Sequence, residues 1–189
     1  MKIHLPIRAK FSAELIRRAS VEAIIPVGTW WEFEHWRKGR LIDQWAQKNV
    51  MMLAGFNHML NVIFFGETPI TAWYIGLFED DYTPLTADTY AVPGFTESEA
   101  FTEAARQAYV PAEATAKILT NTATKATFTI NATKDIYGAF LCGGGSTPAL
   151  LSDVAGGGLM FAAAKFAAVK EVVATDILMM SCRITLGDV

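Results

Sequence analysis

The stretch KATFTINATKDIYGAFLC (Lys125–Cys142) carries the pattern that decides the fold. Alternate residues of Ala126–Ile130 are apolar and the two between them are threonines, which is the period of a half-buried β-strand. The segment Asn131–Asp135 is rich in turn-forming residues. The apolar run Ile136–Cys142 then predicts a second strand. The stretch therefore predicts two consecutive strands joined by a turn.

The same pattern, in which short apolar runs are separated by turn-forming residues, continues on both sides of this stretch from Gly66 onward. The other expected strands are Ile70–Phe78, Arg106–Pro111, Ala116–Leu119, Gly158–Ala163, Val169–Val173 and Ile177–Leu186. About eight short strands with frequent turns and a single helix favour two packed antiparallel sheets. We therefore expect a mainly β fold, an antiparallel, jelly-roll-like β-sandwich with one helix, an N-terminal β-hairpin and an N-terminal arm.

The helix is predicted over Asn49–Phe65, where apolar residues recur at intervals of three or four. Asn49 is suited to cap its start, and Gly66 is suited to end it. Glycine inside a helix costs roughly 1 kcal/mol relative to alanine. We therefore expect a close packing contact at Gly55.

The hairpin is predicted over Trp30–Trp45, because apolar and charged side chains alternate there and a lysine–glycine pair supplies a turn. Three of the five tryptophans in the chain, Trp30, Trp31 and Trp36, lie within seven residues of one another here, and Trp45 lies on the returning strand. Tryptophan is enriched at the centres of protein interfaces, so part of the hairpin is expected to contact another subunit. The alternative, that these rings close the edge of the core, fits the sequence equally well.

The expected organisation is an arm, residues 1–28, followed by one sandwich body, residues 29–189, because 189 residues and 20.7 kDa fit one main core. The arm mixes apolar and basic residues. Chain termini are poorly ordered unless something ties them down, so we expect the arm to pack on its own body or on a neighbour. The apolar side chains expected to make this contact are Ile3, Leu5, Ile7 and Phe11.

Composition and charge narrow the class of function. Hydrophobic residues make up 52% of the chain and charged residues 19%, below the roughly 25% of average soluble domains, which favours burial against partners. A net charge of −3 argues against nucleic-acid binding by bulk phosphate neutralisation. The charge is uneven, since nine basic and five acidic residues precede Asn49. This basic segment is suited to an acidic neighbour, although scattered solvated charge explains it as well.

No motif for catalysis, cofactor binding or metal binding is found. The three histidines are far apart in sequence, and Cys142 and Cys182 are interpreted as small apolar core residues. The glycine run before Ser146 lacks the lysine of a phosphate-binding loop. The acidic cluster Glu79–Asp81 is of a kind that binds calcium, but a solvated turn is favoured. We therefore expect neither an enzyme nor a cofactor.

Aromatic and basic residues interleave at the hairpin tip. Trp36, Arg37, Lys38 and Arg40 are of the types that stack on and neutralise a nucleic-acid strand. The footprint is small and the body acidic, so a protein surface is the favoured target and no nucleic acid is expected. No apolar run is long enough for a membrane span or a secretory signal, so no membrane partner is expected and the cytoplasm is the expected site of synthesis.

Several stretches resemble, in order, those of a group of structural proteins from tailed bacteriophages. The clearest is ITAWYIGLFEDDYTP (Ile70–Pro84), which is similar to a strand of the type A-W-Y-x-G-L that follows a helix in that group. The helix LAGFNHMLNVIF (Leu53–Phe64) is similar to the G-x-N-x-L-L pattern before that strand. The resemblance continues through FTEAARQAYVP (Phe101–Pro111) and ATDILMMSCRITL (Ala174–Leu186), and spans roughly Trp30–Leu186.

This resemblance implies a virion structural protein with no catalytic residues to carry over. The expected function is that of a capsid cement or decoration protein, which binds the major capsid protein lattice on the capsid surface after synthesis in the host cytoplasm. Its expected partners are the major capsid protein and itself, as a trimer or dimer. The alternatives are a tail, neck or fibre component and, less favoured, a carbohydrate-binding domain.

Overall fold

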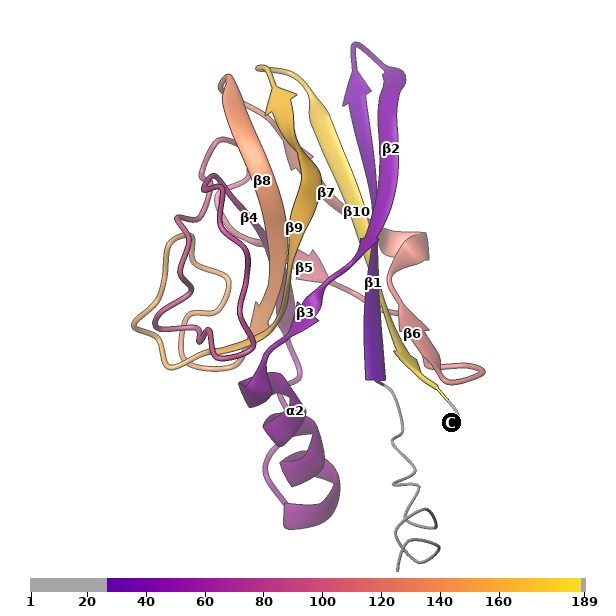
Figure 1. Ribbon diagram of the computed structural model, residues 1–189, viewed down its shortest axis with the longest axis vertical. Coiled ribbons are helices and arrows are strands. Elements are labelled where there is room, and N and C mark those ends of the chain that lie inside the picture. Colours follow the sequence, from indigo (N-terminus) through magenta and orange to yellow (C-terminus); the bar gives the residue numbers. More distant parts are fainter. Residues whose placement is uncertain (1–26, 188–189) are drawn as a thin grey trace, which may run out of the picture.

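The computed structural model describes residues 27–187, which form two antiparallel β-sheets packed face to face, with a single helix at one end (Figure 1). This confirms the predicted mainly β sandwich with one helix. Residues 1–26, and with them most of the expected arm, lie outside the described residues. The first strand begins at Val27, two residues before the expected start of the body.

The first sheet contains β1 (Val27–Arg37), β2 (Arg40–Lys48), β6 (Ile118–Thr120), β7 (Ala126–Thr129) and β10 (Ile177–Leu186). The central pair is β1 and β10, which run antiparallel from Val27 opposite Leu186 to Trp36 opposite Ile177. The short strands β6 and β7 pair with successive parts of the other edge of β10. The first and last strands of the body therefore hold each other in place.

The predicted hairpin is confirmed as β1 and β2. Lys38 and Gly39 form its turn, and their φ angles of 50° and 73° are both positive. Positive φ at both central residues is what a tight two-residue hairpin turn requires, because its twist then matches that of the strands. Glycine adopts this conformation without strain, which explains the Lys-Gly pair at this point of the sequence.

The second sheet contains β3 (Val50–Met51), β4 (Trp73–Phe78), β5 (Gln107–Tyr109), β8 (Lys134–Gly143) and β9 (Leu159–Val172), in the order β3-β9-β8-β4-β5. The two separate strands expected at Gly158–Ala163 and Val169–Val173 are in fact one, β9. The residues between them are mostly alanines, which have low strand propensity. Ala164 and Lys165 pair with Ala139 and Gly138 of β8, and the register of this pair then shifts before Lys170 pairs with Ile136. At this irregularity the Gln47 side chain on β2 hydrogen-bonds to the backbone of Lys165 and Ala167.

The helix consists of α2 (Leu53–Leu60) and a π-helical turn, η1 (Asn61–Phe65), and ends at Gly66 with φ of 77°, as predicted. The predicted start at Asn49 is wrong. The two residues after Asn49 form strand β3 against β9, and the Asn49 side chain hydrogen-bonds to Thr29 on β1 instead of capping a helix. The contact at Gly55 is confirmed, since a Cβ there would lie 2.9 Å from the carbonyl oxygen of Phe161.

The main core lies between the two sheets. Trp31 and Phe33 of β1 point into it and their rings stack, with centroids 5.9 Å apart. Met180 and Cys182 of β10 are buried beside them. Cys142 is buried on the other side of the second sheet, and both cysteines are free thiols, which agrees with their interpretation as apolar core residues.

The outer face of the second sheet is also covered. The long connections 79–106, between β4 and β5, and 144–158, between β8 and β9, fold over it on the left of Figure 1. A second apolar cluster fills the space beneath them, with Phe78, Phe95 and Phe140 at its centre. Because β8 is buried on both faces, its sequence is a continuous apolar run and not an alternating one.

Candidate functional site

The structure separates the predicted contact residues of the hairpin into different environments. Trp31 is fully buried in the main core, so for this residue the core interpretation holds and the interface interpretation is wrong. Trp30 and Trp36 are half-buried on the opposite side of β1, and Lys38 and Arg40 are exposed at the hairpin tip. Ile3, Leu5, Ile7 and Phe11 lie outside the described residues.

Arg37, also a predicted contact residue, is engaged within the chain. Its Nε and Nη2 donate hydrogen bonds of 2.8 and 2.7 Å to the buried carboxylate of Asp176, which also lies 2.8 Å from Nε2 of His35. Burial acts to raise the pKa of Asp176, but Arg37, the Val173 N–H and His35 outweigh it and hold that pKa well below its usual range. This cluster ties the hairpin to the turn before β10.

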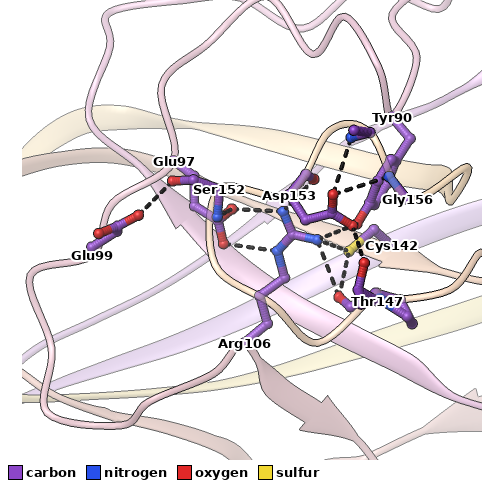
Figure 2. Close-up of polar contacts among 11 residues, drawn as sticks. Tyr90, Glu97, Glu99, Arg106, Cys142, Thr147, Ser152, Asp153 and Gly156 are labelled. Atoms are coloured by element: carbon purple, nitrogen blue, oxygen red, sulfur yellow. Dashed lines mark hydrogen bonds and ion pairs between the residues drawn. The ribbon is translucent and has the colours of Figure 1, made fainter.

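The largest polar cluster surrounds Arg106, directly before β5, and is shown in Figure 2. Its guanidinium forms two parallel hydrogen bonds to Glu97, of 2.9 Å from Nε and 2.6 Å from Nη2. The remaining donors reach the Tyr90 hydroxyl, at 2.8 Å, and the backbone carbonyls of Pro148 and Asp153, at 3.1 and 3.0 Å. Both members of the ion pair are almost completely buried.

This cluster joins the two long connections to each other. Tyr90 and Glu97 belong to the first connection, while Pro148 and Asp153 belong to the second. Asp153 also accepts hydrogen bonds from the Tyr90 hydroxyl and from the backbone of its own loop, at Ala155 and Gly156. Because an arginine has five N–H groups and all of them find acceptors here, the guanidinium is occupied in holding the loops.

A cavity of about 190 Å³ lies beside Arg106 and includes Glu97, Tyr90 and Asp153 in its lining. Burial raises the pKa of Tyr90 to about 12, with a further contribution from Asp153 that Arg106 opposes. Burial likewise raises the pKa of the nearby Cys142 thiol to about 12. A thiol with a raised pKa stays protonated and is a poor nucleophile. The Cys142 thiol is therefore suited to packing and not to nucleophilic attack.

The acidic cluster at Glu79–Asp81 is also engaged within the fold. Glu79 pairs with Lys134 at 2.8 Å, Asp81 pairs with Lys165 at 2.5 Å, and Asp80 hydrogen-bonds to the backbone of Thr96. Among residues 27–187, no three His, Cys, Asp or Glu side chains gather closely enough to hold a metal ion. Within the same described range, no helix is long and apolar enough to cross a membrane.

The strongest candidate for a functional surface is on the helix, which projects beyond the ends of the sheets (Figure 1). Its end carries four large apolar side chains that face solvent, here called the helix patch: Leu60, Ile63, Phe64 and Phe65, with exposed fractions of 57, 66, 80 and 84%. Single exposed apolar residues are common on soluble proteins, whereas large apolar patches often mark interaction sites, which makes the helix patch a candidate.

The sequence pattern predicted the helix but not which side of it packs on the body. The packed side is formed by the buried Gly55 and His58 together with the half-buried Phe56 and Met59, and Gly55 allows the backbone to approach β9 closely. His58 holds the segment after the helix through a 2.6 Å contact between its Nδ1 and Glu67. Leu60, Ile63, Phe64 and Phe65 are left exposed. Since both sides contain apolar residues, spacing alone could not distinguish them.

The clusters around Asp176 and Arg106 were not found from the sequence. Their partners lie far apart along the chain, 139 residues in the case of Arg37 and Asp176, and no spacing signal connects them. The fold defines the class of the protein as an antiparallel β-sandwich with a projecting apolar helix end. Comparison of the sequence with known protein families and with curated proteins finds no match in either.

Proposed function

We propose that this protein is a structural component of a tailed-bacteriophage virion, a capsid cement or decoration protein that binds and stabilises the major capsid protein lattice. The observation that carries the proposal is the helix patch, because four exposed apolar side chains at one projecting end are suited to adhesion between proteins. The resemblance of the sequence to phage structural proteins is the reason for proposing a phage virion as the particle to which this protein binds.

The rest of the molecule supports a role in adhesion. The polar clusters in the described residues are satisfied internally, as at Arg106 and Asp176, and they fix loops and turns in place. A rigid body loses little conformational freedom when it docks, so more of the interface energy appears as affinity. A protein that stabilises a shell acts by mass action, since binding to the assembled lattice favours the assembled state.

The patch predicts which residues dominate binding. Aromatic side chains that enter a partner's surface are often hot spots, and each costs about 2 kcal/mol or more when removed. Phe64 and Phe65 are the most exposed members of the patch. Their replacement by serine removes two aromatic rings from the contact without disturbing the core. We therefore expect the double variant F64S/F65S to fold normally and to lose at least about tenfold in affinity for capsids.

The experiment is co-sedimentation of the full-length chain with capsids that lack it. The matched control is L85S/V92S, which removes two exposed apolar side chains from the connection 79–106. Loss of capsid binding in F64S/F65S, with the control unchanged, supports the proposal. Equal capsid occupancy by both variants would refute the role of the helix patch. Absence of wild-type binding to capsids, with binding to isolated tails, would favour the alternative of a tail, neck or fibre component.

A further inference from the structure

An apolar cavity of about 330 Å³ opens between the two sheets at the end from which the helix projects. It is lined from both sheets and from the helix by Met59, Trp73, Tyr109, Pro111, Leu119, Leu141, Phe161 and Ile184. The two polar groups in this lining are already engaged: the Tyr109 hydroxyl donates to the carbonyl of Cys182, and the Trp73 indole N–H donates to the carbonyl of Ile70. We call this space the end cavity.

The end cavity is suited to apolar side chains. A buried water needs two to four polar partners, and a cavity without them stays dry. An engineered apolar cavity of about 150 Å³ is large enough to bind benzene, so the end cavity has room for more than one apolar side chain. Filling it would remove more of the half-buried side chains Met59, Trp73 and Ile184 from water, which is favourable by the hydrophobic effect.

The N-terminal segment, residues 1–26, enters the fold beside this cavity. Val27 is the first residue of β1 and lies directly opposite Leu186 of β10. Ile184, which lines the end cavity, lies two residues before Leu186 in β10 and is a diagonal neighbour of Val27, at about 7–8 Å in an antiparallel pair. The segment therefore joins the body at the margin of the cavity.

The composition of residues 1–26 is complementary to the apolar end cavity and to the acidic body. Ile3, Leu5 and Ile7 alternate with other residues, so an extended chain presents them on one side, and Phe11 follows. The segment contains five basic and two acidic residues, a net charge of +3, while the rest of the chain carries −6. Apolar side chains can therefore enter the cavity while opposite charges attract the segment to the body.

We propose that the stretch Ile3–Phe11 docks in the end cavity of its own chain. The fifteen residues that connect it to Val27 span at most about 50 Å, enough to turn back across the end of a small domain. Covalent attachment gives such a segment an effective concentration in the millimolar range, which favours docking within one chain over exchange between chains. The inference does not depend on the proposed function.

The first test is a disulfide between the segment and the cavity in the full-length chain. Leu5→Cys and Leu119→Cys place one thiol on the segment and one in the cavity lining. Cys142 and Cys182 are buried, and burial raises the pKa of both thiols, so they compete little. The matched control pairs Leu5→Cys with Leu41→Cys, at the hairpin tip on the opposite end of the sandwich (Figure 1).

We expect mild oxidation to convert most L5C/L119C protein into a cross-linked monomer that migrates faster on non-reducing electrophoresis, and to leave L5C/L41C largely unlinked. Cross-linked dimers would overturn the proposal, because they would show that a second copy supplies the segment. Equal cross-linking of the two variants, or none in either, would overturn it as well.

The second test measures the exposure of the cavity with the dye anilinonaphthalene sulfonate. Both proteins compared carry F64S/F65S, so that the helix patch contributes little dye binding. Replacing Ile3, Leu5, Ile7 and Phe11 by serine should raise dye fluorescence several-fold. The matched control replaces four apolar residues of the connecting stretch, Leu15, Ile16, Ile24 and Ile25, by serine and should leave fluorescence near the starting level. Unchanged fluorescence in the first variant would show that these apolar side chains do not cover the cavity.

Discussion

Replacement of Arg106 by methionine is expected to destabilise the fold strongly. Methionine keeps part of the aliphatic stem but removes every guanidinium donor, which leaves Glu97, whose side chain is 6% exposed, as a buried carboxylate without its cation. Removing one partner of a buried ion pair costs about 3–5 kcal/mol. A chain of this size loses roughly 2–4 °C in melting temperature per kcal/mol, so we expect a decrease of about 6–20 °C.

Thermal unfolding followed by circular dichroism, together with urea unfolding, measures this effect. The matched control is Lys134→Met, because the Lys134–Glu79 pair is partly exposed and its loss should leave the melting temperature close to that of the wild type. A second variant, E97M/R106M, removes both charges and should recover part of the loss, since no unpaired buried charge remains.

A small loss of stability in R106M would contradict this role of the ion pair. If R106M unfolds within about 1 kcal/mol of the wild type, the ion pair behaves as a solvated surface pair and does not hold the two connections together. If E97M/R106M is as unstable as R106M, the loss of stability does not arise from the unpaired, buried carboxylate of Glu97. The contacts of Arg106 with Tyr90 and the loop carbonyls would then carry the stabilisation.

Two further predictions concern backbone packing and pH. Gly55→Ala should lower the free energy of unfolding by about 1–3 kcal/mol in urea titrations, because its Cβ would meet the Phe161 carbonyl oxygen at 2.9 Å, whereas Gly28→Ala, with no atom within 4 Å, should change it little. The pKa of Asp176 is lower in the folded state than in the unfolded chain, so its stabilising contribution is present at neutral pH and is lost as the pH falls from about 5 downward. Urea midpoints should decrease over this range in the wild type, and D176N should start lower and decrease less; parallel curves would exclude Asp176 as the source.

Much of the fold was predictable because the local sequence preference of many segments matches the conformation that they adopt in the folded chain. The strand Ile177–Leu186 was predicted with its observed bounds, since a long apolar run at the centre of a sheet leaves little ambiguity. The hairpin turn at Lys38-Gly39 and the end of the helix at Gly66 follow from backbone conformations that glycine adopts most easily. The continuity of β9 through its alanine-rich middle is not visible in the sequence, because it depends on contacts with β8 and with Gln47 of β2, which are distant along the chain.

The sequence by itself determined the strands, the turns and one helix, because those depend on periodicity and on residues close together in the chain. Only the tertiary structure decided that Trp31 is buried and the helix patch is exposed, since either side of an apolar element can face the core. It also decided that Arg37 meets Asp176, 139 residues away. Such pairings depend on how the two sheets stack, and that is an outcome of the whole chain folding, which no local pattern encodes.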